Sequence, residues 1–315
     1  MISAYISGRL GNQLFQYAYV RALRYYRGDK DTLAFNFDMI EGSNEEFFVN
    51  SLSQFSTLPF SEAHGNLILN SGSMLQKCAF GVYKIYERAA AHCSWLRKQR
   101  AGVCSWLNKF GIVFQPSQQD SAYIDIRPAQ ENVMVYGKFE NPAYLRDIRP
   151  ILLEEFAPRQ PLLPANEELL RVIQESNSVC ISIRRGDYLA KEFVDDFFVC
   201  GKDYYERAIE VIRSKVDNPT FIFFSNDIQW VKANIHVDAP CYYESGTDPN
   251  WETLRLMSAC KHFIISNSTF HWWAQFLCRH ENKIVISPDR WYNNPNWGAY
   301  LLTDSFIQLN TRPTA

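Results

Sequence analysis

An α/β fold of two doubly wound domains is predicted by three features of the sequence. In the second half, short apolar runs alternate with amphipathic segments of helical period, an order typical of parallel sheets covered by helices. The first half opens in the same way, with a strand, a glycine loop and a helix. Three prolines within residues 157–164 then separate the two halves. We therefore expect the domain boundary near residues 157–166.

The first domain, residues 1–157, is expected to begin with a strand over residues 2–7 and a helix over residues 12–27 that stops at Gly28. Further elements are strands over residues 32–37 and 133–136, a helical insertion over about residues 74–114, and a helix over residues 142–156. The insertion is basic, and such a helical face could lie on anionic lipid. The alternative is a peripheral helical pair whose lysines are simply solvated.

The second domain, residues 165–302, shows the clearest alternation of strands and helices. Helices are predicted over residues 167–175, 203–215, 229–235, 248–261 and 270–280, and strands over residues 179–183, 220–224, 263–266 and 283–287. In such a sheet, polar residues that follow successive strands share one edge. Residues 303–315 are assigned to a C-terminal tail.

Composition limits the classes of function that the chain can have. Of its 315 residues, 47% are hydrophobic and 21% charged, and 32 basic against 34 acidic residues give a net charge of −2. A nucleic-acid partner is therefore not expected, and any anion site must be local. The eight cysteines form no CxxC pair, which favours reduced thiols in the cytoplasm. The opening residues are too short an apolar run for a signal peptide, so we expect a cytoplasmic protein that could contact the inner face of the membrane.

Two adjacent arginines mark the strongest candidate site. The apolar run of residues 179–183 stops at Arg184 and Arg185, which then stand at the carboxyl end of a buried strand. Forked guanidinium donors fit phosphate oxygens, so an anionic, phosphorylated ligand is expected there. The alternative is a turn in which arginine and Asp187 pair only with each other.

Two other predicted strand ends carry polar groups. Asn267, Ser268 and Thr269 approach the start of a helix, where the backbone favours negative charge. Ser225 and Asp227 follow the strand of residues 220–224, and Asp227 could accept hydrogen bonds from a nucleobase or ribose. Helix capping alone would also explain these residue types. Trp272 and Trp273, further along the predicted helix, are expected to be core residues.

The N-terminal glycine loop could bring backbone N–H groups and Asn12 against a ligand. Gly8 and Gly11 can adopt backbone angles closed to other residues, although a tight strand-to-helix turn would also use them. The sequence also contains Asp29-Lys30-Asp31, a pattern that binds divalent cations in many sugar transferases. Because it directly follows a helix stop, a solvated turn is expected instead, and no metal site is predicted.

These features together suit a transferase acting on a nucleotide-activated group. Arginines and a helix N-terminus can stabilise the charge that develops on a departing diphosphate, which is a task that a metal performs in other enzymes. The acceptor would bind in the cleft between the domains.

At these residues the sequence resembles the α1,2-fucosyltransferases of glycosyltransferase family 11. Four family motifs occur in order, at residues 8–13, 182–188, 225–227 and 257–274. The resemblance implies a GT-B fold whose two Rossmann-like domains face each other across a cleft. It also implies metal-independent transfer of fucose, with inversion, from GDP-β-L-fucose to the 2-hydroxyl of a terminal galactoside. The acceptor would be an oligosaccharide or a lipid-linked glycan, as in O-antigen synthesis, and no cofactor is implied.

The same resemblance suggests roles for individual residues. Arg184 and Arg185 would meet the GDP phosphates, together with Ser268 and Thr269, and Asp227 would lie on the guanosine side. Asn12 would approach the reacting sugar. The other donor-binding candidates within the motifs are Gly11, Gln13, Ser182, Ser225 and Asn267.

Two positions depart from the family pattern, and the catalytic base is open. Ser182 stands where histidine is usual, and His271 where serine or glycine is common, so turnover and acceptor preference are in question. Inversion normally needs a base near the acceptor hydroxyl, and Asp187 and Glu192 are the nearest carboxylates in the sequence. Two rival functions remain: a fucosyltransferase of another linkage, and a non-catalytic protein that binds a GDP-sugar or a glycan.

Overall fold

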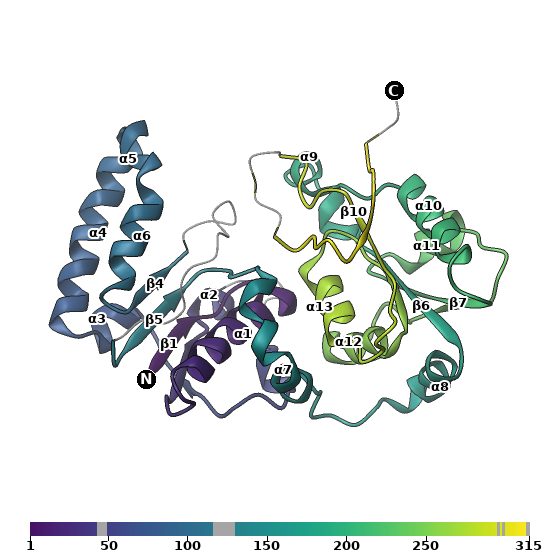
Figure 1. Ribbon diagram of the computed structural model, residues 1–315, viewed down its shortest axis with the longest axis horizontal. Coiled ribbons are helices and arrows are strands. Elements are labelled where there is room, and N and C mark those ends of the chain that lie inside the picture. Colours follow the sequence, from purple (N-terminus) through teal and green to yellow (C-terminus); the bar gives the residue numbers. More distant parts are fainter. Residues whose placement is uncertain (43–48, 116–129, 295–296, 298–299, 313–315) are drawn as a thin grey trace. The chain divides into compact units, whose positions relative to one another are not determined.

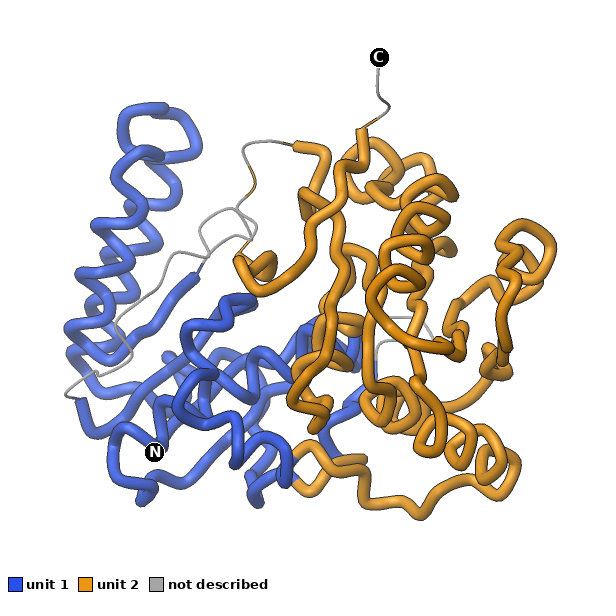
Figure 2. Tube along the Cα trace, turned by 45° about the vertical axis from the view of Figure 1, so that its right-hand side comes forward, with its two compact units in different colours: residues 1–53, 57–155 blue, residues 54–56, 156–315 orange. Residues whose placement is uncertain are grey.

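The computed structural model describes residues 1–42, 49–115, 130–294, 297 and 300–312, and these residues divide into two compact units. Unit 1 comprises residues 1–53 and 57–155, and unit 2 comprises residues 54–56 and 156–315 (Figure 2). The chain passes from unit 1 to unit 2 between Glu155 and Phe156, just before the proline-rich span. Residues 54–56 belong to unit 2 because Ser56 and Arg159 form backbone hydrogen bonds with Ala157 and Gln54, respectively.

Unit 1 contains a parallel sheet with the strand order β3-β2-β1-β5-β4 among its described residues. Its strands are β1 (Ile2–Tyr5), β2 (Leu33–Asn36), β3 (Ser61–Glu62), β4 (Ile112–Phe114) and β5 (Val133–Tyr136). Its helices are α1 (Leu10–Tyr26), α2 (Asp38–Glu41), α3 (Leu67–Ser71), α4 (Met74–His92), α5 (Ser94–Lys98), α6 (Arg100–Asn108) and α7 (Arg149–Glu155). The central strand β1 and the helix α1 that follows it are almost entirely buried, which fixes the loop between them.

Unit 2 contains a second parallel sheet, with the order β11-β10-β9-β6-β7-β8 among its described residues (Figure 1). Its strands are β6 (Asn177–Ile183), β7 (Pro219–Ser225), β8 (Cys241–Tyr243), β9 (His262–Ile264), β10 (Val285–Pro288) and β11 (Ile307–Leu309). Its helices are α8 (Glu167–Glu175), α9 (Val194–Phe197), α10 (Lys202–Arg213), α11 (Ile228–Asn234), α12 (Asn250–Ala259) and α13 (Thr269–Leu277). Both sheets are doubly wound α/β layers, so the predicted fold class is confirmed.

The core of unit 2 explains why strand β6 is central. Alternate residues Val179, Ile181 and Ile183 are fully buried in one apolar cluster with Tyr204 and Ile212 of α10. Trp272 and Trp273 are also buried, as predicted, and the Trp272 indole donates to the Leu301 carbonyl. Burial on both faces requires the near-continuous apolar run that the sequence shows at β6.

Two predicted elements are corrected by the structure. Residues 142–148 form short 3₁₀ turns rather than the start of a long helix, and only Arg149–Glu155 is α-helical. Pro150 explains the break, because its ring excludes an uninterrupted helix through residue 146. The predicted tail also contains a strand: Ile307–Leu309 pairs in parallel with Ile286–Pro288.

Candidate functional site

The carboxyl edge of the unit 2 sheet gathers polar side chains from neighbouring strands. Arg184 and Arg185 follow β6, Ser225 ends β7 and Asp227 follows it, and Ser266–Thr269 follow β9. Strands β7, β6 and β9 are adjacent in the sheet and run in parallel, so these side chains share one edge. This edge is the usual position of ligands in open α/β sheets.

Arg185 is held in place by groups from the next strand end. Its Nε lies 3.2 Å from Asp227 Oδ2, and its guanidinium stacks on Trp230 at 3.7 Å from the ring centroid. Asp227 therefore has two partners, because it also caps α11 by accepting from the Trp230 backbone N–H. Arg185 thus pairs across two strand ends, while the alternative prediction, a pairing with Asp187, falls on a side chain outside the described part of the structure. A stacked, ion-paired guanidinium is preorganised for a planar anion.

Arg184 and the turn after it are fixed by close packing. The Arg184 guanidinium lies 5.5 Å from the Tyr188 ring centroid, and the Tyr188 hydroxyl donates to the Asn267 carbonyl. Gly186 is required here, because a Cβ at this position would lie 2.0 Å from the Asn226 side-chain nitrogen. Asn226 in turn accepts from the Arg185 backbone N–H. The turn therefore holds both arginines at defined positions.

Ser268 and Thr269 stand at the N-terminus of α13. Ser268 is the N-cap residue, yet its hydroxyl makes no capping hydrogen bond, and Thr269 is the first helical residue. The helix N-terminus offers backbone N–H groups and the positive end of the helix dipole. This arrangement can accept a phosphate oxygen.

His271 lies behind this helix terminus and is not a ligand-facing group. Its Nδ1 is 2.7 Å from the buried Ser266 hydroxyl. Burial, with a smaller contribution from the Arg184 charge, lowers the pKa of His271 to about 3. The imidazole is therefore neutral in the folded protein at physiological pH.

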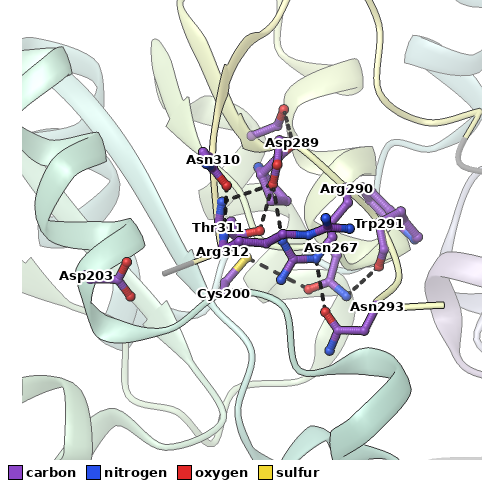
Figure 3. Close-up of polar contacts among 12 residues, drawn as sticks. Cys200, Asp203, Asn267, Asp289, Arg290, Trp291, Asn293, Asn310, Thr311 and Arg312 are labelled. Carbon is purple, nitrogen blue, oxygen red and sulfur yellow. Dashed lines mark hydrogen bonds and ion pairs between the residues drawn. The ribbon is translucent and has the colours of Figure 1, made fainter. Parts of the chain in front are cut away.

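Three predicted donor-binding residues of unit 2 already have hydrogen-bond partners within the fold. Ser182 is fully buried in β6 and donates to the Ile264 carbonyl. The Ser225 hydroxyl accepts from the Asp227 backbone N–H and closes the turn. The Asn267 amide donates to the carbonyl of Phe197, at the end of α9, and to the carbonyl of Trp291 (Figure 3), so it ties α9 to the loop that contains Trp291. Side chains whose donors are already used by the backbone are poor candidates for a ligand site.

In unit 1, the loop after β1 is shaped by Gly8, whose φ of +76° favours glycine. Helix α1 begins at Leu10, earlier than predicted, so Gly11 lies in its first turn and does not provide an unusual backbone angle. Gln13 is fully buried, donates to the carbonyls of Gly8 and Val49, and accepts from the Ser51 backbone N–H. Gln13 is therefore a structural residue of this loop.

Asn12 meets a carboxylate that the sequence reasoning missed. Its Nδ2 donates to Glu140 Oε1 at 2.6 Å, and Glu140 follows strand β5, the neighbour of β1. Lys138 lies beside them: its ammonium donates to the Ser7 hydroxyl, and a Cβ at position 8 would lie 2.9 Å from it. Burial raises the pKa of Glu140 and lowers the pKa of Lys138, while their opposite charges counteract both shifts. An amide, a carboxylate and an ammonium thus share this sheet edge.

The backbone between Lys138 and Glu140 is strained. Phe139 has a φ of +53°, which is uncommon for a bulky residue. Stacking on Tyr19, with ring centroids 3.8 Å apart, and a 2.7 Å hydrogen bond to the Gln115 side chain hold it there. Strain that the surroundings enforce is typical of functional sites, and the Gly137-Lys138-Phe139-Glu140 turn directly after a strand was the available sequence signal.

The remaining predicted residues do not join these clusters. Glu192 is exposed in the turn before α9, and the side chain of Asp187 lies outside the described part of the structure. Asp29 lies in an exposed turn, as predicted, and both Asp29 and Asp31 also bind arginines. Asp29 lies 2.8 Å from both Arg21 and Arg24, and Asp31 pairs with Arg27.

Two α/β units with such sheet edges are the architecture of GT-B glycosyltransferases. The structure of NodZ alpha-1,6-fucosyltransferase co-crystallized with GDP has the same fold, with a TM-score of 0.51 and 10% identity over 91% of this chain and 94% of that one. The chain belongs to glycosyl transferase family 11, whose model matches residues 1–301.

Three relatives illustrate the range of the family. The chain is 35% identical to the O-antigen biosynthesis glycosyltransferase WbnK of Escherichia coli over 47% of its own length and 54% of the relative. It is 31% identical to an alpha-1,2-colitosyltransferase of Escherichia coli over 54% of this chain and 59% of that one. Galactoside alpha-(1,2)-fucosyltransferase 2 of Rattus norvegicus is 27% identical over 42% and 40%, respectively. The chain thus spans about half the length of the curated relatives that it matches.

Proposed function

We propose that the protein transfers L-fucose from GDP-β-L-fucose to the 2-hydroxyl of a terminal galactoside, with inversion and without a metal ion. The observation that carries the proposal is the edge of unit 2, where Arg184, Arg185 and the N-terminus of α13 stand at neighbouring strand ends. These groups can bind a diphosphate and stabilise it as it leaves. The family relatives whose names specify alpha-1,2 transfer support the linkage.

Different residues of unit 2 would contact the phosphates and the nucleoside of the donor. Arg184 and the backbone N–H groups at Ser268 and Thr269 would bind the phosphates, and Arg185 would add a second forked contact. One Asp227 oxygen accepts from Arg185, and the other accepts from the backbone N–H that caps α11. Asp227 would therefore affect nucleoside binding mainly by holding Arg185 and Trp230 in position. Charge on the leaving diphosphate grows during transfer, so these contacts strengthen toward the transition state.

The residues of unit 1 would orient the reacting sugars. Glu140 fixes the Asn12 amide through a short hydrogen bond, and Asn12 would meet the sugar. Glu140 acts in this proposal as a positioning residue. It is also a carboxylate whose pKa is raised by burial, so it replaces Glu192 as the first base candidate to test.

A second donor is favoured by the relative named alpha-1,2-colitosyltransferase. Colitose lacks one hydroxyl of fucose, and a site that hydrogen-bonds that hydroxyl would reject the colitose donor strongly. The two donors therefore give clearly different rates. The acceptor would be a galactose-terminated oligosaccharide or lipid-linked glycan of the kind made in O-antigen synthesis, as the name of WbnK suggests.

The proposal is tested by incubating the purified protein with GDP-fucose or GDP-colitose and lactose in the presence of EDTA. We expect a trisaccharide with an α1,2 linkage, identified by NMR, and a preference for one donor. Arg184→Ala should abolish the product, while Arg171→Ala, an exposed arginine of α8 paired with Glu168 and Glu175, should leave it unchanged. A product with another linkage would support the rival fucosyltransferase, and tight GDP binding without product would support the non-catalytic reading.

A further inference from the structure

The helical insertion of unit 1 presents one face that nothing in the described structure covers. Helices α4 and α6 form a hairpin with α5 at its tip, away from the sheet (Figure 1). Helix α4 buries Gln76, Ala79, Tyr83 and Ala90, of which Ala79 and Tyr83 belong to a small apolar cluster that also contains Leu107 of α6. The opposite side of α4 faces solvent.

This exposed side of α4 is apolar rather than polar. Leu75, Cys78, Val82, Ile85 and Ala89 follow each other at alternating intervals of three and four residues and are all exposed. Leu75 and Ile85 are each 69% exposed and Val82 is 55% exposed. Side chains at this spacing form one continuous stripe along a helix. A contiguous apolar stripe on a surface marks an interaction site more often than scattered apolar residues do.

Positive charge surrounds the stripe. Residues 74–109 contain seven lysines and arginines but a single acidic residue, Glu87, in a chain whose net charge is −2. Lys84 and Arg88 flank the stripe on α4, and Lys84 lies 3.5 Å from Glu87 and 5.3 Å from the centroid of the Phe80 ring. At the tip, Trp95 is 65% exposed between the hairpin arms, beside exposed Arg97 and Lys98.

A groove opens next to the same stripe. It has a volume of about 370 Å³ and lies between α4 and α6. It is lined by Val82, Tyr83, Tyr86, Gln99, Val103 and Trp106, with Gly102 in its floor. Val82 belongs both to the stripe and to the groove, so the apolar surface continues into the hairpin. The lining is mainly aromatic and aliphatic, which suits a hydrocarbon chain better than a sugar.

We propose that this hairpin docks on an anionic lipid surface. The stripe and Trp95 would enter the interface, and the surrounding lysines and arginines would contact lipid headgroups. Each feature has a role in such a complex: apolar area drives insertion, tryptophan favours the interface, and each basic residue near an anionic surface adds electrostatic attraction. A second copy of the chain fits less well, because its hairpin would bring the same excess of positive charge.

The inference is tested by co-sedimentation of the full chain with vesicles, which needs neither substrate nor activity. We expect binding to vesicles of phosphatidylcholine with 30% phosphatidylglycerol and at least tenfold weaker binding to pure phosphatidylcholine. Raising the salt concentration should weaken the binding, because screening reduces the headgroup attraction. Equal binding to both vesicle types, or none to either, would overturn the proposal.

Variants locate the binding surface. Val82→Ser/Ile85→Ser and Lys84→Glu/Arg88→Glu should each reduce binding at least tenfold, whereas Tyr242→Ser and Arg171→Glu, exposed changes in unit 2, should not. Circular dichroism and a cooperative thermal unfolding transition would show that each variant is folded, and these controls keep the result independent of the proposed function. A dimer in sedimentation velocity that Val82→Ser/Ile85→Ser dissolves, without vesicle binding, would instead identify a second copy as the partner.

Discussion

The carboxyl edges of the two sheets have the same strand-turn-helix construction but carry different charges. In each unit a buried strand ends in a tight turn, and a helix begins within a few residues. The unit 2 edge holds two arginines and a helix N-terminus. Among the described contacts, Asp227 is the carboxylate that pairs with Arg185. The unit 1 edge holds Asn12, Glu140 and Lys138, in which the charges are balanced. The comparison teaches that one turn geometry can serve either to bind an anion or to orient a neutral group.

Within unit 1, the largest effect on activity is expected at Asn12. Asn12→Ala removes the amide that would meet the reacting sugar, so kcat should fall about 10²-fold or more, while donor KM stays within about threefold. Steady-state kinetics with GDP-fucose and lactose measure both. An unchanged kcat would remove unit 1 from the proposed chemistry.

Glu140 distinguishes positioning from proton transfer. Glu140→Ala should lower kcat about tenfold to 10²-fold, because Asn12 loses its partner. Glu140→Gln keeps an oxygen that can accept from Asn12, so it should restore most of the activity if Glu140 only positions. A Gln variant as poor as the Ala variant would identify Glu140 as the base. Glu192→Gln is the matched control at an exposed carboxylate and should remain active.

Metal independence is a separate test of the same contrast. We expect 5 mM EDTA to leave transfer unchanged, because arginines supply the charge at the unit 2 edge. Among the described residues, Asp38, Glu41 and His64 are the one group of potential metal ligands within 4.8 Å of one another, and all three are exposed. If EDTA stops transfer, Asp38→Asn would show whether this cluster is responsible.

A smaller effect is expected from the pH dependence of stability in unit 2. The pKa of His271 is about 3 in the folded protein and about 6.5 when unfolded, so the unfolded chain gains a proton first as the pH falls. Stability contributed by the neutral histidine is therefore lost below about pH 6.5, by up to ~1.4 kcal/mol per pH unit. Urea denaturation gives the free energy of unfolding at pH 7.5 and at pH 5.5. The change in this free energy between the two pH values should be smaller for His271→Asn than for the exposed-site control His236→Asn. Identical pH slopes would contradict the buried, neutral state.

The smallest effect on activity is expected for Ser182, because the structure buries it inside β6. Ser182→Ala should cost about 1 kcal/mol of stability through the lost hydrogen bond to Ile264 and change kcat by less than about twofold. Denaturation and kinetics on one preparation measure both. A large loss of activity without a loss of stability would mean that Ser182 meets the donor after all.

The strongly periodic elements and the residues that meet at the edge of unit 2 were predictable from the sequence, but the partners of each polar side chain were not. Strand β6 and the arginines after it were predictable, because a buried apolar run that stops at charge has few alternatives. Gln13 and Asn267 were assigned to the donor, whereas their amides bind backbone carbonyls. Whether a side-chain amide binds a ligand or a backbone carbonyl depends on which loops pack beside it, and these loops are distant in the sequence. Glu140 was missed for the same reason, since its partner Asn12 is 128 residues away.

Short or interrupted elements also escaped prediction. β8 and β11 have three residues each, too few to show a period. The prediction of one helix over residues 142–156 did not take account of Pro150. The structure shows that the chain forms 3₁₀ turns before this proline and an α-helix only from Arg149. The described residues include no helix long and apolar enough to cross a membrane.

The most direct test of the central claim is calorimetric titration of GDP into the protein in EDTA, with no acceptor present. The account predicts that the wild-type protein and Arg171→Ala bind GDP equally and that Arg184→Ala binds at least about 10²-fold more weakly, a loss of ~2.7 kcal/mol. Unchanged GDP affinity in Arg184→Ala, or binding that appears only after Mg²⁺ is added, would contradict it.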